Sequence, residues 1–169
     1  MFKKKSISQK IKQKARRSLK RTISKQKKNY VIDTSAIINK FIPILLHKGI
    51  TGRIIIPNAV MAELENQANK GREEGFLGLE EVAKLHKLKH KFQVKIFFEG
   101  TRPNEMQIKF AKSGEIDALI REIARKNNAV LVTSDLVQAK TAQAYGLDVS
   151  YLRPKLQIQK KRRFLFWKK

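Results

Sequence analysis

The stretch "NYVIDTSAII" at residues 29–38 joins a short apolar run to one acid and two hydroxyl side chains. Tyr30 to Ile32 has the composition of a buried strand, and the residues from Thr34 onward favour a helix. Asp33 lies at the junction and is the first acid of the chain, although 13 Lys and Arg residues precede it. An acid in this position is either the N-cap of the following helix or a ligand at a strand end.

The same alternation of strand and helix continues along the chain. Several of the expected strands are apolar without alternation, which is typical of a parallel sheet covered on both faces. The sequence therefore predicts an α/β fold, a three-layer α/β/α sandwich with a central, mostly parallel sheet. Pro43 is expected to kink or break the first helix, Asn58 to cap the second, and Phe76 to lie on the apolar face of the third. The expected strands are 30–32, 53–56, 93–98, 129–133 and 148–152, and the expected helices are 34–46, 59–70, 75–91, 103–112, 114–128 and 136–146.

Four acids lie beside apolar residues at positions that this fold would bring together. Asp33 and Asp135 follow strands, and Glu63 and Asp117 lie early in helices that begin near the same edge of the sheet. Four carboxylates in one cleft would raise one another's pKa, and a hard cation such as Mg²⁺ or Mn²⁺ would remove that cost.

Each acid taken alone also has a simpler explanation. Asp33 and Asp135 could be helix caps, and Asp117 could favour its helix N-terminus through the dipole. Glu63 could pair with Lys70 or face solvent. These alternatives remain open at the level of residue pattern.

The charge of the chain is concentrated at its two ends. Residues 1–28 hold 13 of the 38 Lys and Arg residues and residues 153–169 hold 8, with no acid in either segment. The chain is thus expected to consist of a basic N-terminal arm at 1–28 that could be helical, a nearly balanced domain at 29–152 and a basic aromatic C-terminal tail at 153–169. Such segments favour nucleic acid, although they could also aid solubility or bind a membrane surface or another protein.

The aromatic residues of the tail and the lack of apolar runs narrow the expected partners. Phe164, Phe166 and Trp167 stand among bases, where they could stack on single-stranded RNA or pack against protein. No run of about 18 apolar residues occurs, so no stable membrane insertion is expected. Cysteine is absent, which fits a reducing compartment, and a cytoplasmic location is expected.

Four segments of the balanced domain resemble the ordered motifs of the PIN domain family, the PilT N-terminus-like metal-dependent nucleases. The resemblance spans residues 29–152, and "GFLGLEEVAKL" is most similar to the PIN domain of archaeal PIN–KH–ATPase proteins. This chain contains no GxxxxGK[ST] phosphate loop, so the ATPase part is missing from it. The four segments are "VIDTSAII", "IIIPNAVMAELE", "GEIDALIREIARKNNAVLVTSD" and "YGLDVSYL".

The resemblance implies a four-carboxylate metal site and a ribonuclease activity. Asp33 and Asp117 are expected to bind Mg²⁺ or Mn²⁺ directly, and Ser35 and Thr133 to position the carboxylates or water. The expected reaction is hydrolysis of RNA phosphodiester bonds to 5′-phosphate and 3′-hydroxyl ends. The alternatives are an RNA-binding or assembly module with little cleavage, and a docking subunit; a homo-oligomer is also compatible with the family. The implied ligand set is Asp33, Glu63, Asp117 and Asp135.

Deleting residues 1–28 should weaken RNA binding and flatten its dependence on salt, because each lost phosphate contact removes one released counterion. Fluorescence anisotropy with one RNA at several salt concentrations measures both quantities. An unchanged affinity would mean that this arm serves another partner.

Overall fold

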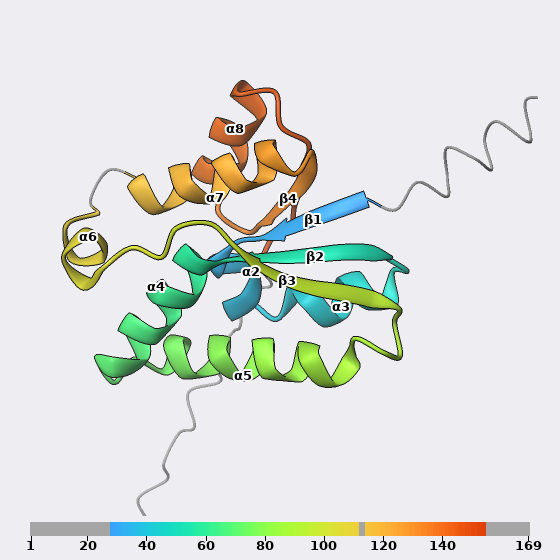
Figure 1. Cartoon of the computed structure of the whole chain (residues 1–169), viewed down its shortest axis with the longest axis horizontal. Coiled ribbons are helices and arrows are strands. Elements are labelled where there is room, and N and C mark those ends of the chain that lie inside the picture. The colour runs from blue at the N-terminus through green and yellow to red at the C-terminus, as the bar shows by residue number, and fades with distance from the viewer. Residues whose placement is uncertain (1–27, 112–113, 155–169) are drawn as a thin grey trace, which may run out of the picture.

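Five strands form a single sheet in the computed structural model, which describes residues 28–111 and 114–154 (Figure 1). Every neighbouring pair is parallel, and the order across the sheet is β3-β2-β1-β4-β5. The expected arm and tail lie almost entirely outside the described residues. The strands are β1 (Lys28–Ile32), β2 (Gly52–Pro57), β3 (Val94–Glu99), β4 (Ala129–Thr133) and β5 (Val149–Tyr151).

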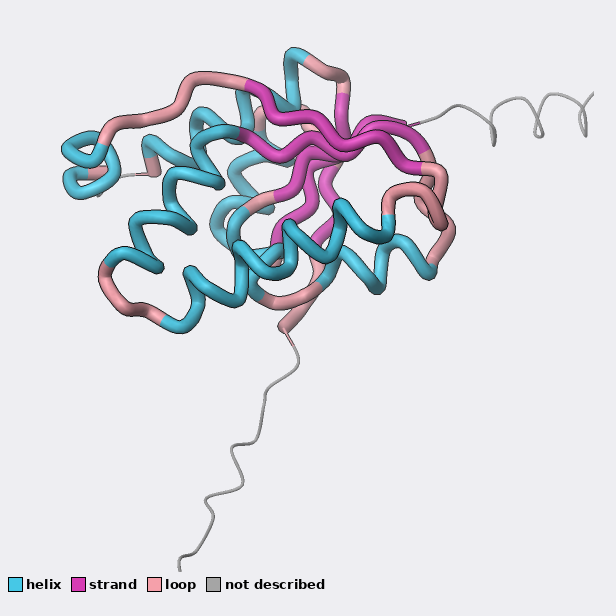
Figure 2. Tube along the Cα trace, turned by 60° about the horizontal axis from the view of Figure 1, so that its bottom comes forward, coloured by secondary structure: helices cyan, strands magenta, loops and turns pink. Residues whose placement is uncertain are grey.

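Helices cover both faces of this sheet. Figure 1 shows α3, α4 and α5 on one side and α7 and α8 on the other, and Figure 2 shows the twisted sheet between these helical layers. The predicted three-layer α/β/α fold is therefore confirmed, and the described sheet is entirely parallel. The helices are α2 (Thr34–Ile38), α3 (Phe41–His47), α4 (Asn58–Asn69), α5 (Glu73–Leu88), α6 (Glu105–Phe110), α7 (Glu115–Lys126) and α8 (Leu136–Ala144).

The central strands explain why the sheet holds together. Ile54, Ile55 and Ile56 of β2 are fully buried, as are Leu131 and Val132 of β4. Consecutive strand residues point to opposite faces, so an unbroken apolar run requires cover on both sides. The helical layers supply that cover, and burial of each such side chain contributes about 1.5–3 kcal/mol.

The strand order reverses between β1 and β4. From β1 the chain moves outward through β2 to β3, then returns to place β4 and β5 on the other side of β1. At such a reversal the connections leave in opposite directions, and a crevice opens outside the carboxyl ends of the two strands. Asp33 follows β1 directly, and Thr133 is the last residue of β4.

The first helix is broken three residues earlier than expected. The predicted helix at 34–46 is two helices, because Lys40 adopts a left-handed backbone with φ 57° between α2 and α3. Pro43 does not cause the break. It lies in the first turn of α3, where proline is tolerated since its missing N–H has no partner within the helix.

Two further local expectations were wrong. Asn58 does not cap α4: it is the first residue of that helix, and its amide donates to the Gly100 carbonyl at 2.7 Å. Phe76, expected on the apolar face of the next helix, is 52% exposed. The close approach of α5 to α4 is made instead at Gly75 and Gly78, where an added Cβ would meet residues of α4.

Gly75→Ala should destabilise the domain more than Gly78→Ala. A Cβ at Gly75 would lie 2.2 Å from the Ala68 backbone nitrogen and 2.7 Å from the Leu64 carbonyl oxygen. At Gly78 the nearest atom is Cδ2 of the Leu64 side chain, which can rotate. Forcing two backbones apart costs about 1–3 kcal/mol, more than the roughly 1 kcal/mol that alanine gains in a helix. Urea unfolding of both variants measures the difference, and equal stabilities would contradict this packing.

Candidate metal centre

Asp33 lies at the N-cap position of α2, but its carboxylate does not cap the helix. Its backbone carbonyl accepts the first helical bonds, from Ala36 and Ile37, while its side chain makes no capping bond. The carboxylate instead accepts hydrogen bonds at Oδ2 from the hydroxyls of Ser35, at 2.5 Å, and Thr133, at 2.7 Å. Asp33 is only 4% exposed.

The hydroxyls of Ser35 and Thr133 connect α2 to the end of β4. Their oxygens lie 3.2 Å apart, and Ser35 also accepts from the backbone N–H of Ser134 at 2.9 Å. The Thr133 hydroxyl accepts from the Asp135 N–H at 3.0 Å. Two residues expected to position Asp33 thus contact it, and Thr133 also contacts the backbone of Asp135.

Glu63 approaches the same edge of the sheet from α4. Its carboxylate accepts from the Thr34 hydroxyl at 2.6 Å and from the Gln67 amide at 3.3 Å. Thr34 and Gln67 had not been identified from the sequence as site residues. Thr34 stands beside Asp33 in the motif "DTS", and this hydroxyl is the one signal that could have identified it.

Asp135 and Asp117 lie at the starts of α8 and α7. Asp135 is exposed, and its Oδ1 accepts from the backbone N–H groups of Val137, at 2.7 Å, and Gln138, at 3.1 Å. It therefore caps α8, as one of the two sequence-based alternatives expected. Asp117 lies in the first turn of α7 and is half-buried.

The pKa of Asp117 responds to the charges of the other three carboxylates. Burial, followed by the negative charges of Asp33 and Asp135, raises the pKa of Asp117 to about 6; Arg121 opposes this rise and Glu63 adds to it. Burial also raises the pKa of Asp33, and hydrogen bonds from Ser35 and Thr133 oppose that shift. The pKa of Glu63 is raised by burial and, more weakly, by Asp33.

These side chains suit a divalent cation in chemistry, although they do not already surround one. Carboxylate and hydroxyl oxygens are the donors that Mg²⁺ and Mn²⁺ prefer. Within residues 28–111 and 114–154, no three His, Cys, Asp or Glu side chains converge closely enough to form a metal site. After burial, repulsion from the other three acids raises the pKa of Asp117, and a bound cation would remove that repulsion.

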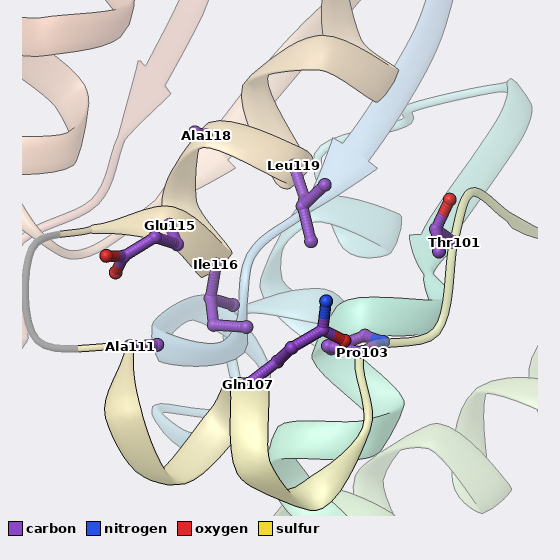
Figure 3. A pocket seen from close by; sticks show the side chains of 8 residues that line it. All are labelled: Thr101, Pro103, Gln107, Ala111, Glu115, Ile116, Ala118 and Leu119. Carbon is purple, nitrogen blue, oxygen red and sulfur yellow. The ribbon is translucent and has the colours of Figure 1, made fainter.

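A separate apolar hollow lies beside α7 without including any of the four acids. Its volume is 490 Å³, and Figure 3 shows its walls coming from the loop after β3, from α6 and from the start of α7. Ile116 and Leu119 point into it, on either side of Asp117 in the sequence. The hollow therefore adjoins the carboxylate centre without being part of it.

The all-parallel sheet between two helical layers, with acids at its carboxyl edge, defines a small α/β domain, and comparison with known proteins gives its family. Residues 30–144 match the PIN domain family, and this chain belongs to it. PIN domains are generally metal-dependent nucleases.

The relatives include archaeal proteins much longer than this chain. An uncharacterized KH and PIN-domain containing protein of Methanocaldococcus jannaschii is 42% identical over 127 residues, 74% of this chain and 20% of that protein. The Holliday junction branch migration ATPase PINA of Sulfolobus acidocaldarius is 24% identical over 131 residues, 76% of this chain and 24% of that protein. The chain thus spans about a fifth to a quarter of these relatives, and the expected similarity to PIN domains of such archaeal proteins is confirmed.

One solved structure supports the same assignment. A domain of a functionally unknown protein from Methanocaldococcus jannaschii is 42% identical, with a TM-score of 0.71 over 76% of this chain and 93% of that one. None of the described helices is both long and apolar enough to cross a membrane.

Asp117→Asn should stabilise the metal-free protein at pH 7.5 and leave it unchanged at pH 4. In the folded protein the pKa of Asp117 is about 6, above its ordinary value of 3.8, so folding favours the protonated acid. The ionisation penalty is absent below pH 4 and grows as pH rises toward 6. After allowance for partial exposure it is about 1 kcal/mol at neutral pH. Thermal unfolding in EDTA at both pH values measures it.

The matched control is Glu122→Gln, on the exposed side of the same helix. Equal shifts in the melting temperature of the two variants at pH 7.5 would contradict the crowding of charge around Asp117.

Proposed function

We propose that this chain is a metal-dependent ribonuclease that hydrolyses RNA phosphodiester bonds at the four-carboxylate centre. The observation that carries the proposal is the buried Asp33 carboxylate at the end of β1, which Ser35 and Thr133 hold at Oδ2. The pKa of Asp117, raised by burial and then by the charges of Asp33, Asp135 and Glu63, supports it. Acids from four separate elements interact at the carboxyl edge of the sheet, where open parallel sheets bind their ligands. Crowded carboxylates are costly to stability and are typical of a functional site.

Asp33 and Asp117 are the proposed direct ligands of Mg²⁺ or Mn²⁺, and Glu63 and Asp135 complete the set. When bound, the metal supplies positive charge for a phosphate oxygen and lowers the pKa of the attacking water. The hydroxyls of Ser35 and Thr133 hold Oδ2 of Asp33 in place, so its position is fixed before the cation arrives. Thr34 does the same for Oε2 of Glu63.

Cation binding would also offset the charge that these acids share. Nearby carboxylates raise one another's pKa, and a bound cation would remove that repulsion. The ionised form of Asp117 would be stabilised most, because three neighbouring acids raise its pKa. An ionised carboxylate of this set can then accept the proton of the attacking water.

The basic segments are proposed to bind the RNA backbone. The backbone N–H of Leu152 donates to the Thr133 carbonyl at 3.0 Å, so the chain leaves the sheet toward the C-terminal tail beside the proposed centre. Lys28 begins β1 at the opposite edge of the parallel sheet. The tail is therefore attached where phosphates would be cut, and the arm is attached about 16 Å away, the length of a five-residue strand.

The second candidate is an RNA-binding or assembly module with little cleavage. It is favoured by the fact that the described acids do not already form a metal site. The similarity to a protein named for both KH and PIN domains is compatible with either function. Activity in the presence of a cation separates the two.

Asp33→Asn should abolish Mn²⁺-dependent cleavage of an RNA that contains single-stranded and hairpin segments. The amide keeps the shape of the side chain but removes the charge of a proposed ligand, and loss of one such group lowers activity by about 10²-fold or more. Gel electrophoresis of end-labelled RNA with and without Mn²⁺ measures this. RNA binding in EDTA should remain nearly unchanged, because the basic arms supply it.

Glu80→Gln is the control, because this acid is exposed on α5 and lies outside the proposed ligand set. A second readout is independent of turnover: Mn²⁺ should raise the melting temperature of the unmutated chain but not that of the Asp33→Asn protein. Cleavage that persists in Asp33→Asn would exclude the proposed centre, and metal-independent binding without any cleavage would favour the second candidate.

A further inference from the structure

A basic and aromatic groove runs along α7 away from the carboxylate centre. It has a volume of 410 Å³, and we name it the Arg–Tyr groove. One wall comes from α7, and the other comes from the segment between α8 and β5, which Figure 1 shows beside α7 on the same face of the sheet. Its lining residues are Ala118, Arg121, Glu122, Arg125, Tyr145 and Leu147.

The groove begins at the proposed centre. Ala118 follows Asp117 in the sequence, and Arg121 and Arg125 lie one and two turns further along α7. Residues four apart lie on the same face of a helix, so the three charged side chains form a line about 12 Å long. The positive charge of Arg121 lowers the pKa of Asp117, so this arginine acts on that acid.

Tyr145 stands on the opposite wall as an exposed ring. It follows the last turn of α8 and is 73% exposed, the second most exposed large apolar side chain among the described residues. The guanidinium of Arg121 lies 5.8 Å from the centre of the ring. A neighbouring polar hollow of 260 Å³ shares Arg125, Tyr145 and Leu147, so the ring stands between two depressions.

The two arginines form no ion pair among the described residues, although Arg121 partly offsets the charge of Asp117. Glu122 lies on the same wall and is the one acid in the groove. Two guanidinium groups against one carboxylate leave a net positive lining. Guanidinium groups bind phosphate in a fork geometry and stack on planar rings.

We propose that the Arg–Tyr groove binds a single-stranded stretch of RNA leading away from the carboxylate centre. Arg121 and Arg125 contact successive phosphates, and an unpaired base stacks on the ring of Tyr145. An aromatic ring among cations is the usual platform for single strands, because every base has a stacking face and its backbone carries phosphate. In a duplex those faces are covered by neighbouring bases, so Tyr145 selects against paired RNA. This inference rests on the proposed function only for the identity of the centre from which the strand leads.

The test uses the full chain in EDTA, so that it reads binding alone. The probes are a labelled uridine oligomer of about 12 nucleotides, near the site size of small single-strand-binding domains, and a duplex of equal length. The basic arm and tail bind phosphates of both probes, so the ratio of the two affinities isolates the groove. Tyr145→Ala should lower affinity for the single strand about tenfold and affinity for the duplex less than about twofold.

Two control variants match the two kinds of side chain removed. Phe98→Ala removes an exposed ring from β3, at the far edge of the sheet, and should leave the ratio unchanged. Arg125→Ala should weaken single-strand binding and reduce its salt slope by about one, whereas Arg72→Ala, which removes an exposed arginine before α5, should not alter the ratio.

A photocrosslinking experiment keeps the proposal testable if a variant loses stability. An oligomer that contains 4-thiouridine should crosslink to the peptide that includes Tyr145 in the unmutated chain. Equal affinity ratios for Tyr145→Ala and Phe98→Ala, or crosslinks confined to the arm and tail, would overturn the proposal. Both results are obtained without metal, so they remain decisive if the chain cleaves no RNA.

Discussion

The hydrogen bond from the Thr133 hydroxyl to the Asp33 carboxylate joins two residues one hundred positions apart. It can form only because β1 and β4 are neighbours, and the Asp33 N–H extends their ladder by donating to the Val132 carbonyl at 3.0 Å. Ser35 closes a triangle of oxygens around the same carboxylate. The reversal of strand order thus holds a buried acid in place with two hydroxyl donors.

The four carboxylates are stabilised in different ways, and this divides their roles. Hydroxyl donors favour the ionised forms of Asp33 and Glu63, opposing the effect of burial. One carboxylate oxygen of Asp135 accepts hydrogen bonds from backbone N–H groups at the N-terminus of α8. Asp117 has Arg121 as its compensating group, and this guanidinium does not offset the surrounding negative charge. Asp117 is therefore the member of the set whose charge depends most on what else enters the crevice.

Much of the fold follows from local sequence because apolar runs, acids and turn residues act over short distances. The runs at Ile54–Ile56 and Leu131–Val132 predict buried parallel strands, and acids placed after such strands predict a shared edge. The roles of Ser35 and Thr133 came from family resemblance alone, since their contact depends on strand order, which no local pattern encodes. The break at Lys40 was not predicted, because proline indicates a break only inside a helix and Pro43 lies in the first turn of α3. The Arg–Tyr groove depends on how α8 ends beside α7, which the sequence does not reveal.

The capping role of Asp135 has a consequence for how related sequences are interpreted. Its carboxylate satisfies two backbone N–H groups at the start of α8, and loss of such a cap costs roughly 0.5–2 kcal/mol whatever the domain does. Selection for folding alone would therefore retain an acid or asparagine at this position. A family member without hydrolytic activity would still be expected to carry it. Burial raises the pKa of Asp33, and burial and crowding raise that of Asp117. Substitutions are therefore expected first at these two positions in family members without that activity.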